Sequence, residues 1–280
     1  MMSWAGAAGL RQSFENNMST SFLPVDMTGR RVLVTAGGAG IGRTIAAAFR
    51  ARGARVAVCD VSKDALDAMH ALLPDVSGQR VDVADPAAVA CMFVAVEREF
   101  GGLDVLVNNA GIAGPTAGVE DVTPDALQET LAVNVSSQFH CARHAVPLLK
   151  AAGGGSIINL SSIAGRLGFA MRSPYAASKW AVIGFTKSLA VELGECNIRV
   201  NAILPGHVNS DRFRRVVTAK AAALGIGFDE MRHQYLDVVS LKRNVEADDI
   251  ANMALFLASP FGDSITGQAI SVCGDVQMLK

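Results

Sequence analysis

The sequence predicts an α/β domain: a doubly wound parallel sheet of about seven strands with helices on both faces. Short β-branched runs alternate with stretches of helical periodicity along the chain. A glycine-rich turn joins the first such strand to the first helix, and polar residues follow several strands where they end. Because ligands bind beyond the carboxyl ends of strands in open parallel sheets, the sequence also predicts a site at that edge.

The composition points to one compact domain. Half of the 280 residues are apolar, the net charge is −1, and no repeat or shift in composition divides the chain. We interpret residues 1–27 as a flexible N-terminal extension and residues 28–280 as the domain. The extension lacks the basic start and apolar run of a secretory signal, and we expect no transmembrane helix. The balanced charge does not indicate a nucleic-acid partner.

The cysteines bear on the cellular setting. There are five of them, an odd number, scattered without a CxxC spacing or a Cys/His group. This pattern argues against a disulfide framework and against a zinc site, so we predict no metal and a reducing, cytoplasmic setting.

The first strand, Arg31–Thr35, leads into the turn AGGAGIG at residues 36–42 and a helix over 43–52. Small residues at a strand–turn–helix junction let the backbone approach a pyrophosphate at the helix N-terminus. The second strand, Arg55–Asp60, ends about twenty positions after this turn. There Asp60 can accept hydrogen bonds from both adenosine ribose hydroxyls and repel a 2′-phosphate, which favours NAD over NADP. The alternative is that Asp60 caps the helix that starts near Ser62.

The alternation continues to the C-terminus. We predict strands over 79–83, 103–107, 156–162, 198–204 and 268–272, and helices over 86–100, 123–150, 174–193 and 245–257. Asn134 lies inside the apolar run of the 123–150 helix, where it either satisfies a structural hydrogen bond or holds a water. Residues 211–244, with an amphipathic segment around 228–239, are predicted to form a lid that decides substrate choice.

Ser162, Tyr175 and Lys179 form a candidate catalytic group. Tyr175 and Lys179 are four residues apart and share a helix face. A free tyrosine has a pKa of about 10, and a neighbouring ammonium lowers that pKa by favouring the phenolate. Ser162 can hydrogen-bond an oxygen held beside the phenol. The competing interpretation is an amphipathic helix whose lysine extends its charge into solvent.

With these motifs assembled, the chain resembles the short-chain dehydrogenase/reductase family from about residue 28 to 274. The resemblance rests on TAGGAGIG at 35–42, NNAG at 108–111, YxxxK at 175–179, Ser162, Asn134 and the turn at Pro205. It implies a single-domain Rossmann fold and an NAD-dependent enzyme acting on CH–OH groups. Family members are often tetramers that pair long helices and the C-terminal strand, so we expect a homo-oligomer, either a tetramer or a dimer.

The resemblance also implies a role for each matching residue. Tyr175 is the acid/base, Lys179 lowers its pKa and binds the nicotinamide ribose, Ser162 orients the reacting oxygen, and Asn134 holds a water that links Lys179 to solvent. The cofactor phosphates and adenosine ribose contact Ala36, Gly38, Ala39, Gly40, Ile41, Gly42 and Asp60. The adenine contacts Asp82 and Val83, the ribose lies along Asn109, Ala110 and Gly111, and the carboxamide contacts Pro205, Gly206, Val208 and Ser210.

The chain departs from the family pattern at three motif positions. Ala36 replaces the first glycine of the turn, Ser210 stands where threonine is common, and VCGD at 272–275 replaces the common VDGG. None of these changes removes a catalytic group.

Charged residues near the motifs bear on the substrate. Arg166 and Arg172 lie between Ser162 and Tyr175, whereas His207 and Arg212 follow the turn at Pro205. Arginine suits bidentate binding of carboxylates, although each of these side chains could instead be solvated or lie in a subunit contact. As a set they favour an anionic small molecule, such as a small polar hydroxy acid or a sugar acid.

Two alternatives stay open at this point. A 3-oxoacyl thioester reductase would also accommodate the arginines, but such reductases usually use NADPH, which Asp60 disfavours. A non-catalytic nucleotide-binding relative would typically lack the tyrosine or the lysine, and both are present here.

Overall fold

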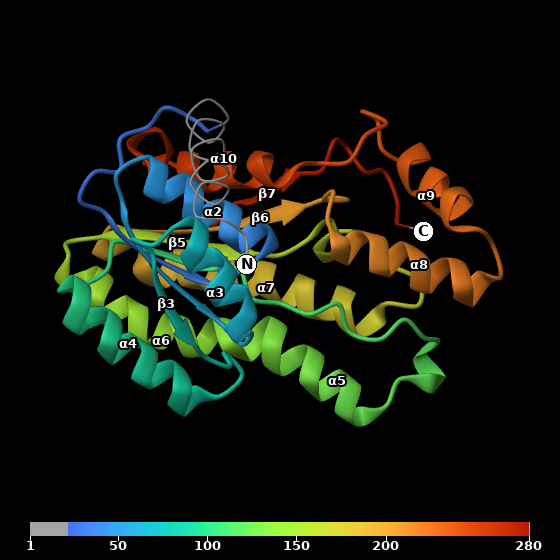
Figure 1. The fold of residues 1–280 in the computed structure, drawn as a ribbon, viewed down its shortest axis with the longest axis horizontal. Coiled ribbons are helices and arrows are strands. Elements are labelled where there is room, and N and C mark those ends of the chain that lie inside the picture. The colour runs from blue at the N-terminus through green and yellow to red at the C-terminus, as the bar shows by residue number, and fades with distance from the viewer. Residues whose placement is uncertain (1–21, 280) are drawn as a thin grey trace, which may run out of the picture.

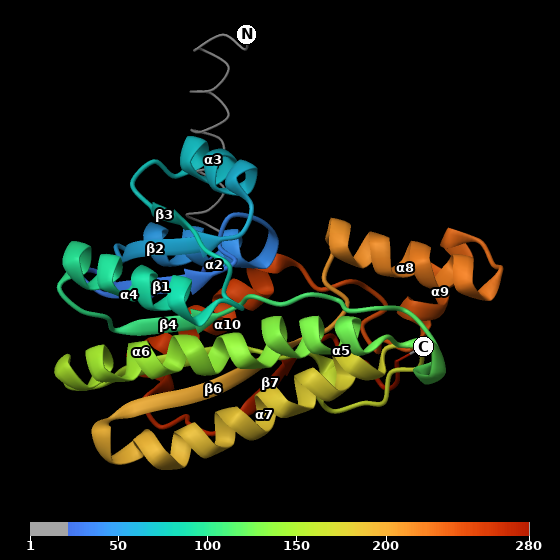
Figure 2. The ribbon, with the colours of Figure 1, turned by 90° about the horizontal axis from the view of Figure 1, so that it is seen from below.

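The computed structural model describes residues 22–279, and its centre is one seven-stranded, entirely parallel sheet (Figure 1). The strand order is β3-β2-β1-β4-β5-β6-β7, which Figure 2 shows from β3 near the top to β6 and β7 below. The strands are β1 (Arg31–Thr35), β2 (Arg55–Asp60), β3 (Ser77–Arg80), β4 (Val105–Asn108), β5 (Gly155–Leu160), β6 (Ile198–Pro205) and β7 (Ala269–Val272). The predicted fold class is confirmed.

Helices cover both faces of the sheet. One face packs against α2 (Gly40–Ala51), α3 (Lys63–Leu72) and α10 (Ala247–Ala258), and the other against α4 (Pro86–Phe100), α6 (Ser137–Ala151) and α7 (Ser173–Leu193). Successive side chains of β1 point to opposite faces of the sheet, so the core has two parts. Val32 and Val34 pack on the face of the first group of helices, and Leu33 packs on the face of the second. Strands buried on both faces explain the nearly continuous apolar runs in the sequence.

The predicted single helix over 123–150 is interrupted. It consists of α5 (Pro124–Leu131), a π-helical segment (Ala132–Ser136) and α6. Asn134, within that segment, is fully buried; its oxygen accepts from the Ile112 amide at 2.7 Å and its Nδ2 donates to the Ile112 carbonyl at 3.1 Å and to Ser178 Oγ at 3.0 Å. The local widening of the helix therefore lets one side chain connect the loop after β4 to α7, as π segments at functional sites often do.

Two predicted strands end earlier than expected. β3 stops at Arg80 instead of residue 83, because the chain turns at Asp82, whose carboxylate accepts from the Ala84 amide at 2.9 Å. β5 stops at Leu160 instead of residue 162. Ser162 begins a short 3₁₀ turn instead, and its Oγ accepts from the Ala164 amide at 3.1 Å.

The predicted boundary after residue 27 needs correction. Within residues 22–27, Phe22 and Met27 are buried in the core beside α2 and α10. The Leu23 amide donates to Asn252 Oδ1 at 2.6 Å, and the Met27 amide donates to the Arg52 carbonyl at 2.8 Å. The packed domain therefore includes Phe22, and the rest of the predicted extension, residues 1–21, lies outside the described residues.

The predicted lid contains two helices, α8 (Asp211–Leu224) and α9 (Phe228–Asp237), which project beyond the carboxyl end of the sheet in both ribbon views. Its own small core contains Val217, Ala221, Met231 and Tyr235. Among the described helices, none is long and apolar enough to cross a bilayer.

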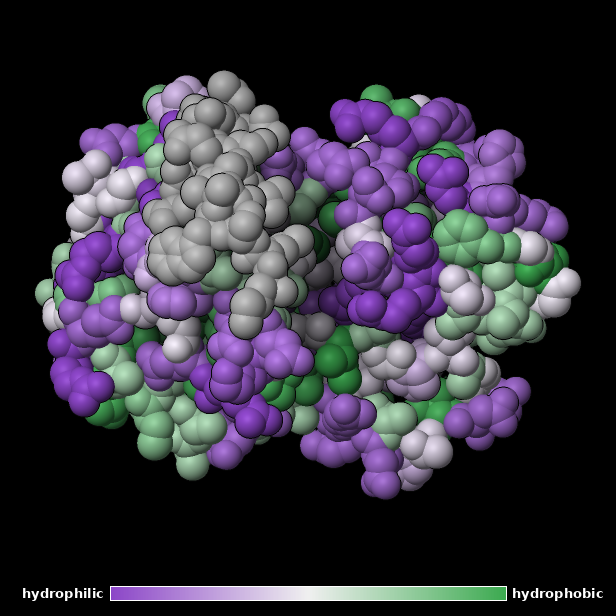
Figure 3. Space-filling model, viewed as in Figure 1, coloured by the Kyte–Doolittle hydropathy of each residue, from purple (hydrophilic) through white to green (hydrophobic). Residues whose placement is uncertain are grey.

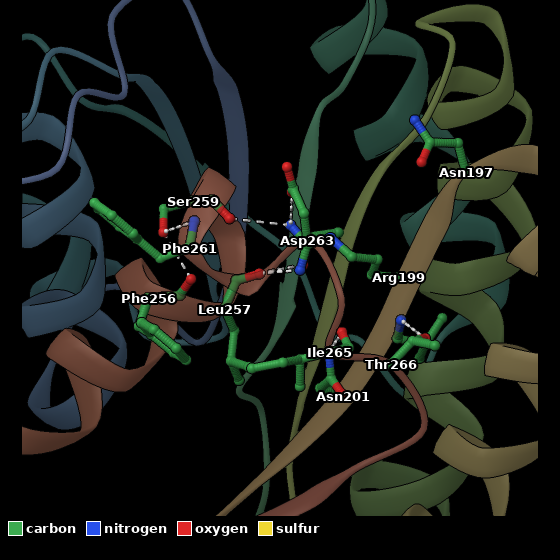
Figure 4. Close-up of polar contacts among 12 residues, drawn as sticks. Asn197, Arg199, Asn201, Phe256, Leu257, Ser259, Phe261, Asp263, Ile265 and Thr266 are labelled. Carbon is green, nitrogen blue, oxygen red and sulfur yellow. Dashed lines mark hydrogen bonds and ion pairs between the residues drawn. The ribbon is translucent and has the colours of Figure 1, made fainter.

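Arg199 on β6 ties the sheet to the end of α10 and to the segment that follows it (Figure 4). Its guanidinium donates to the Leu257 carbonyl and to the Ser259 carbonyl, the latter at 3.5 Å, and lies 3.6 Å from an Asp263 oxygen. On the same strand, Asn201 Nδ2 donates to the Ile265 carbonyl at 2.7 Å. These bonds fix the segment from which the chain enters β7.

Arg199→Met should destabilise the protein by about 1–3 kcal/mol, because it leaves the Leu257 and Ser259 carbonyls without this donor in a half-buried setting. Urea unfolding followed by circular dichroism measures the change. The same substitution at the exposed Arg98 on α4 is the control and should stay within about 0.5 kcal/mol. Equal effects of the two substitutions would show that the bonds of Arg199 contribute nothing.

Candidate active site

The glycine turn between β1 and α2 brings backbone close to two other elements. A Cβ added at Gly42 would lie 2.5 Å from Asn109 Nδ2, which follows β4, and one at Gly38 would lie 3.0 Å from Asp60 Oδ2, at the end of β2. Ala36 adopts a left-handed φ of 50°, a conformation that costs a residue with a Cβ about 1–2 kcal/mol. The turn therefore keeps its shape although alanine replaces the first glycine. At Gly40, the first residue of α2, an added Cβ would meet nothing within 4 Å, so an open cradle lies at the N-terminus of α2.

The turn after β4 is fastened to the glycine turn. Thr35 Oγ1 accepts from the amides of Asn109, at 2.9 Å, and Ala110, at 3.0 Å. Asn109 Nδ2 donates back to the carbonyls of Thr35, at 2.9 Å, and Ala36, at 3.1 Å. The motifs TAGGAGIG and NNAG thus form one hydrogen-bonded unit at the carboxyl edge of the sheet.

Asp60 closes the other side of the glycine turn. Its Oδ2 accepts from the Gly38 amide at 3.1 Å and its Oδ1 from the Ser62 amide at 3.0 Å. The helix cap of α3 is Ser62, whose Oγ accepts from the Ala65 amide at 3.2 Å, so the alternative that Asp60 is the cap is wrong. Each carboxylate oxygen of Asp60 keeps a further lone pair for a ligand.

Ser162, Tyr175 and Lys179 come together at the start of α7. Ser162 hydrogen-bonds the Tyr175 phenol, and the Lys179 ammonium lies 5.8 Å from the centre of the Tyr175 ring. Lys179 is buried, and its Nζ donates to the Leu160 carbonyl at 2.9 Å. A Cβ at Gly111 would lie 3.1 Å from Asn134 Oδ1 and 3.2 Å from Lys179 Nζ, so both polar groups converge on the NNAG turn.

The phenol of Tyr175 lies among three cations. Besides Lys179, the guanidinium carbons of Arg172 and Arg212 lie 5.3 Å and 5.8 Å from the ring centre. Burial raises the pKa of Tyr175, but Arg212, Lys179, the Ser162 hydrogen bond and Arg172 together bring it below its ordinary value. Burial lowers the pKa of Lys179 to about 8, since the attraction of Tyr175 only partly opposes burial and Arg212 lowers it further. Such a phenol can accept a proton nearer neutral pH than a free tyrosine can.

A cleft opens in front of Tyr175, between the sheet and the α8–α9 lobe, and Figure 3 shows a hollow in this region of the surface. The predicted residues that line it are Ile41, Asn109, Gly111, Ser162, Arg172, Tyr175, Lys179, Pro205, Gly206, His207, Val208, Ser210 and Arg212. The structure therefore brings the motif residues predicted around the nicotinamide to one cavity together with four of the five predicted substrate residues, Ser162, Arg172, His207 and Arg212.

Arg166 is the predicted substrate residue that does not line this cavity. Its guanidinium donates to Ser271 Oγ at 3.2 Å and to the Ala269 carbonyl, which ties it to β7. The structure therefore does not bring Arg166 together with the other predicted substrate residues, because its side chain bonds β7 after the 3₁₀ segment (Ile163–Gly165).

Much of the cavity wall consists of residues that no sequence motif predicted. The additional lining residues include Phe169, Phe213, Val216, Tyr235 and Leu279. Tyr235 carried a weak signal, since it is one of two tyrosines in the chain and lies in the predicted amphipathic segment. Leu279 lies near the C-terminus and carried none.

Comparisons with known proteins agree with this geometry. Residues 35–275 match the model of a family described as enoyl-(acyl carrier protein) reductase. A 3α-hydroxysteroid dehydrogenase from Mediterraneibacter gnavus is 38% identical over 248 residues, which are 86% of this chain and 94% of that protein. The chain belongs to the short-chain dehydrogenase/reductase family.

Two further relatives support the same assignment. A trans-4-hydroxycyclohexanecarboxylate dehydrogenase from Sinomonas cyclohexanicum is 38% identical over 261 residues, which are 89% of this chain and 93% of that protein. A solved structure of a 7α-hydroxysteroid dehydrogenase complexed with NADH and 7-oxo glycochenodeoxycholic acid has a TM-score of 0.82 and 31% identity, covering 92% of this chain and 98% of that one. This short-chain dehydrogenase/reductase is thus an oxidoreductase that acts on CH–OH groups with a nicotinamide cofactor.

Proposed function

We propose that the protein is an NAD-dependent dehydrogenase that oxidises the secondary alcohol of a small hydroxy acid, with Tyr175 as the base. The observation that carries this proposal is the phenol of Tyr175, which lies among three cations in the cavity that the cofactor motifs also line. Acid/base work at an alcohol oxygen requires a base of this kind at neutral pH.

The residues at the glycine turn fit a dinucleotide. The open cradle at Gly40 admits a pyrophosphate at the N-terminus of α2, where backbone amides and the helix dipole favour negative charge. Asp60, beside this cradle, favours the two ribose hydroxyls of NAD over a 2′-phosphate. When bound, the cofactor supplies the hydride acceptor, with the nicotinamide on the side of Pro205 and Ser210.

The chain itself supplies the proton transfer. Ser162 donates a hydrogen bond that holds the substrate oxygen, and the Tyr175 phenolate accepts the hydroxyl proton as the hydride leaves the carbinol carbon, which becomes a carbonyl. Lys179 keeps the phenolate stabilised through its charge. A water held where Asn134 Oδ1 and Lys179 Nζ converge beside Gly111 would return this proton to solvent.

The cavity favours a particular kind of acid. Part of the cavity wall is apolar and consists of Phe169, Phe213, Val216 and Leu279. Such a wall suits a hydrocarbon skeleton better than the polyhydroxylated body of a sugar acid. Arg172 and Arg212 supply positive charge in the same cavity. The names of two relatives mention acids on alicyclic skeletons, a hydroxycyclohexanecarboxylate and a bile acid derivative. We therefore favour an alicyclic hydroxy acid.

NADH formation at mildly alkaline pH tests the proposal. The panel contains 4-hydroxycyclohexanecarboxylate, other hydroxy acids, sugar acids, neutral polyols and 3-hydroxyacyl thioesters. The highest kcat/KM is expected with NAD and an alicyclic hydroxy acid. Activity on neutral polyols alone would contradict the proposal that the substrate is an acid. Turnover of thioesters with NADP alone would favour the 3-oxoacyl reductase alternative.

Arg212→Met should move the pH profile of alcohol oxidation to higher pH. After burial, Arg212 acts most strongly on the pKa of Tyr175, and it lowers that pKa. Without it the phenolate forms at higher pH, so kcat/KM at neutral pH falls roughly tenfold for each unit by which the pKa rises, and recovers in alkali. The control is Arg214→Met, an exposed arginine on the same helix that does not line this cavity. If Arg212→Met instead lowered kcat/KM by the same factor at every pH, the electrostatic role of Arg212 would be contradicted.

A further inference from the structure

Three polar side chains of the cavity hold buried atoms without a hydrogen-bond partner. They are Arg172 at Nε, His207 at both ring nitrogens and Tyr235 at the hydroxyl oxygen. The exposed fractions of these residues are 2%, 7% and 1%. Buried polar groups are nearly always paired, so three unpaired ones in a single cavity point to a bound group that supplies the missing acceptors.

Arg172 is a buried cation without an anion. Its Nη2 donates to the Ala113 carbonyl at 2.6 Å and its Nη1 to Thr116 Oγ1 at 3.5 Å, and within residues 22–279 no carboxylate pairs with it. Burial lowers the pKa of Arg172, with Tyr175 and Tyr235 acting against this shift, yet a guanidinium stays protonated in proteins. Burying such a charge is unfavourable unless an anion joins it.

His207 and Tyr235 pack against each other in the cavity that Arg172 also lines. The ring centres of His207 and Tyr235 lie 4.8 Å apart, edge to face, and both rings contact Phe213. Burial lowers the pKa of His207 to about 4, so its imidazole is neutral and offers one N–H. Burial also raises the pKa of Tyr235 to about 12, although Arg172 opposes that shift, so its hydroxyl keeps its proton. All three residues can therefore donate to an acceptor at neutral pH.

We propose that Arg172, His207 and Tyr235 form a subsite that binds the carboxylate of the substrate. A carboxylate suits it because an ionised acid only accepts hydrogen bonds and carries the charge that Arg172 lacks. The guanidinium carbon of Arg172 lies 5.3 Å from the centre of the Tyr175 ring, so one small molecule can reach both groups. The identification of the bound anion as substrate rests on the proposed function, and Arg172 is then a residue that determines specificity.

Binding of inert ligands tests the subsite without requiring turnover. Cyclohexanecarboxylate and its uncharged isostere cyclohexanecarboxamide both fill apolar space, but only the first carries the anion. Isothermal titration of the NADH-saturated protein should show the acid binding at least about tenfold more tightly than the amide. Equal affinities would overturn the subsite. A protein that shows the preference but oxidises no alcohol would instead contradict the proposed function alone.

Variants assign the preference to residues. Arg172→Met should weaken acid binding by about 100-fold and leave amide binding within a few-fold. Tyr235→Phe removes only the unpaired hydroxyl, so it should weaken acid binding by about five- to tenfold while the melting temperature does not fall. Arg166→Met, outside the cavity, should keep the full preference. If Arg172→Met fails to fold, Tyr235→Phe decides: unchanged acid binding in that variant would overturn the proposal.

Discussion

Tyr175→Phe should reduce kcat/KM for alcohol oxidation by about 1,000-fold, within the range that general acid–base catalysis contributes, while NADH binding changes little. The substitution removes the one phenol that contacts Ser162 and lies among Lys179, Arg172 and Arg212. The ring, and with it the packing at the start of α7, stays in place. The loss should therefore fall on kcat and not on the affinity for NADH.

Steady-state kinetics and NADH fluorescence titration measure the two quantities. Tyr235→Phe is the matched control, because it removes the phenol oxygen from the other of the two tyrosines in the chain, and both tyrosines line the same cavity. There we expect a raised KM for acids and a kcat within about tenfold of the wild type. Turnover by Tyr175→Phe close to the wild-type rate would show that another group is the base.

Asp60→Asn should lower the ratio of kcat/KM for NAD to that for NADP by roughly 100-fold, which corresponds to about 2.7 kcal/mol. The substitution removes the negative charge that repels a 2′-phosphate and weakens acceptance from the ribose hydroxyls. Asparagine keeps the shape of the side chain and one oxygen for the amides of Gly38 and Ser62, so the glycine turn should persist.

Initial rates with each cofactor measure the ratio. Asp64→Asn, the same change at an exposed position in the first turn of α3, is the control and should leave the ratio unchanged. A wild-type protein that prefers NADP, or a ratio that Asp60→Asn does not alter, would contradict the assignment of Asp60.

The parts of the fold that local sequence determines were predictable. β1, β2 and α4 have the predicted bounds, because each combines an unmistakable pattern with a sharp end, such as the glycine turn or the proline at the start of α4. The four-residue spacing likewise predicted that Tyr175 and Lys179 share a helix face, and the Lys179 ammonium lies 5.8 Å from the centre of the Tyr175 ring. These features follow from periodicity and turn chemistry along a short stretch of chain.

What the sequence could not predict depends on contacts between distant segments. The π segment at Asn134 exists because that side chain bonds Ile112 and Ser178, which lie on other elements. Arg166 and Arg172 looked equivalent in the sequence, yet the first bonds β7 and the second faces the cavity. Tyr235 joins the wall only because α9 folds back over His207. Periodicity within one element contains no information about such partners.

Transfer of a label tests the central claim most directly. A 4-hydroxycyclohexanecarboxylate that carries deuterium at the carbinol carbon is oxidised with NAD, and the NADH is analysed by mass spectrometry. Hydride transfer from a secondary alcohol predicts that the NADH contains the deuterium and that kcat falls with the heavier isotope where chemistry limits the rate. NADH without the label, or no NADH from any hydroxy acid of the panel, would contradict the proposed reaction.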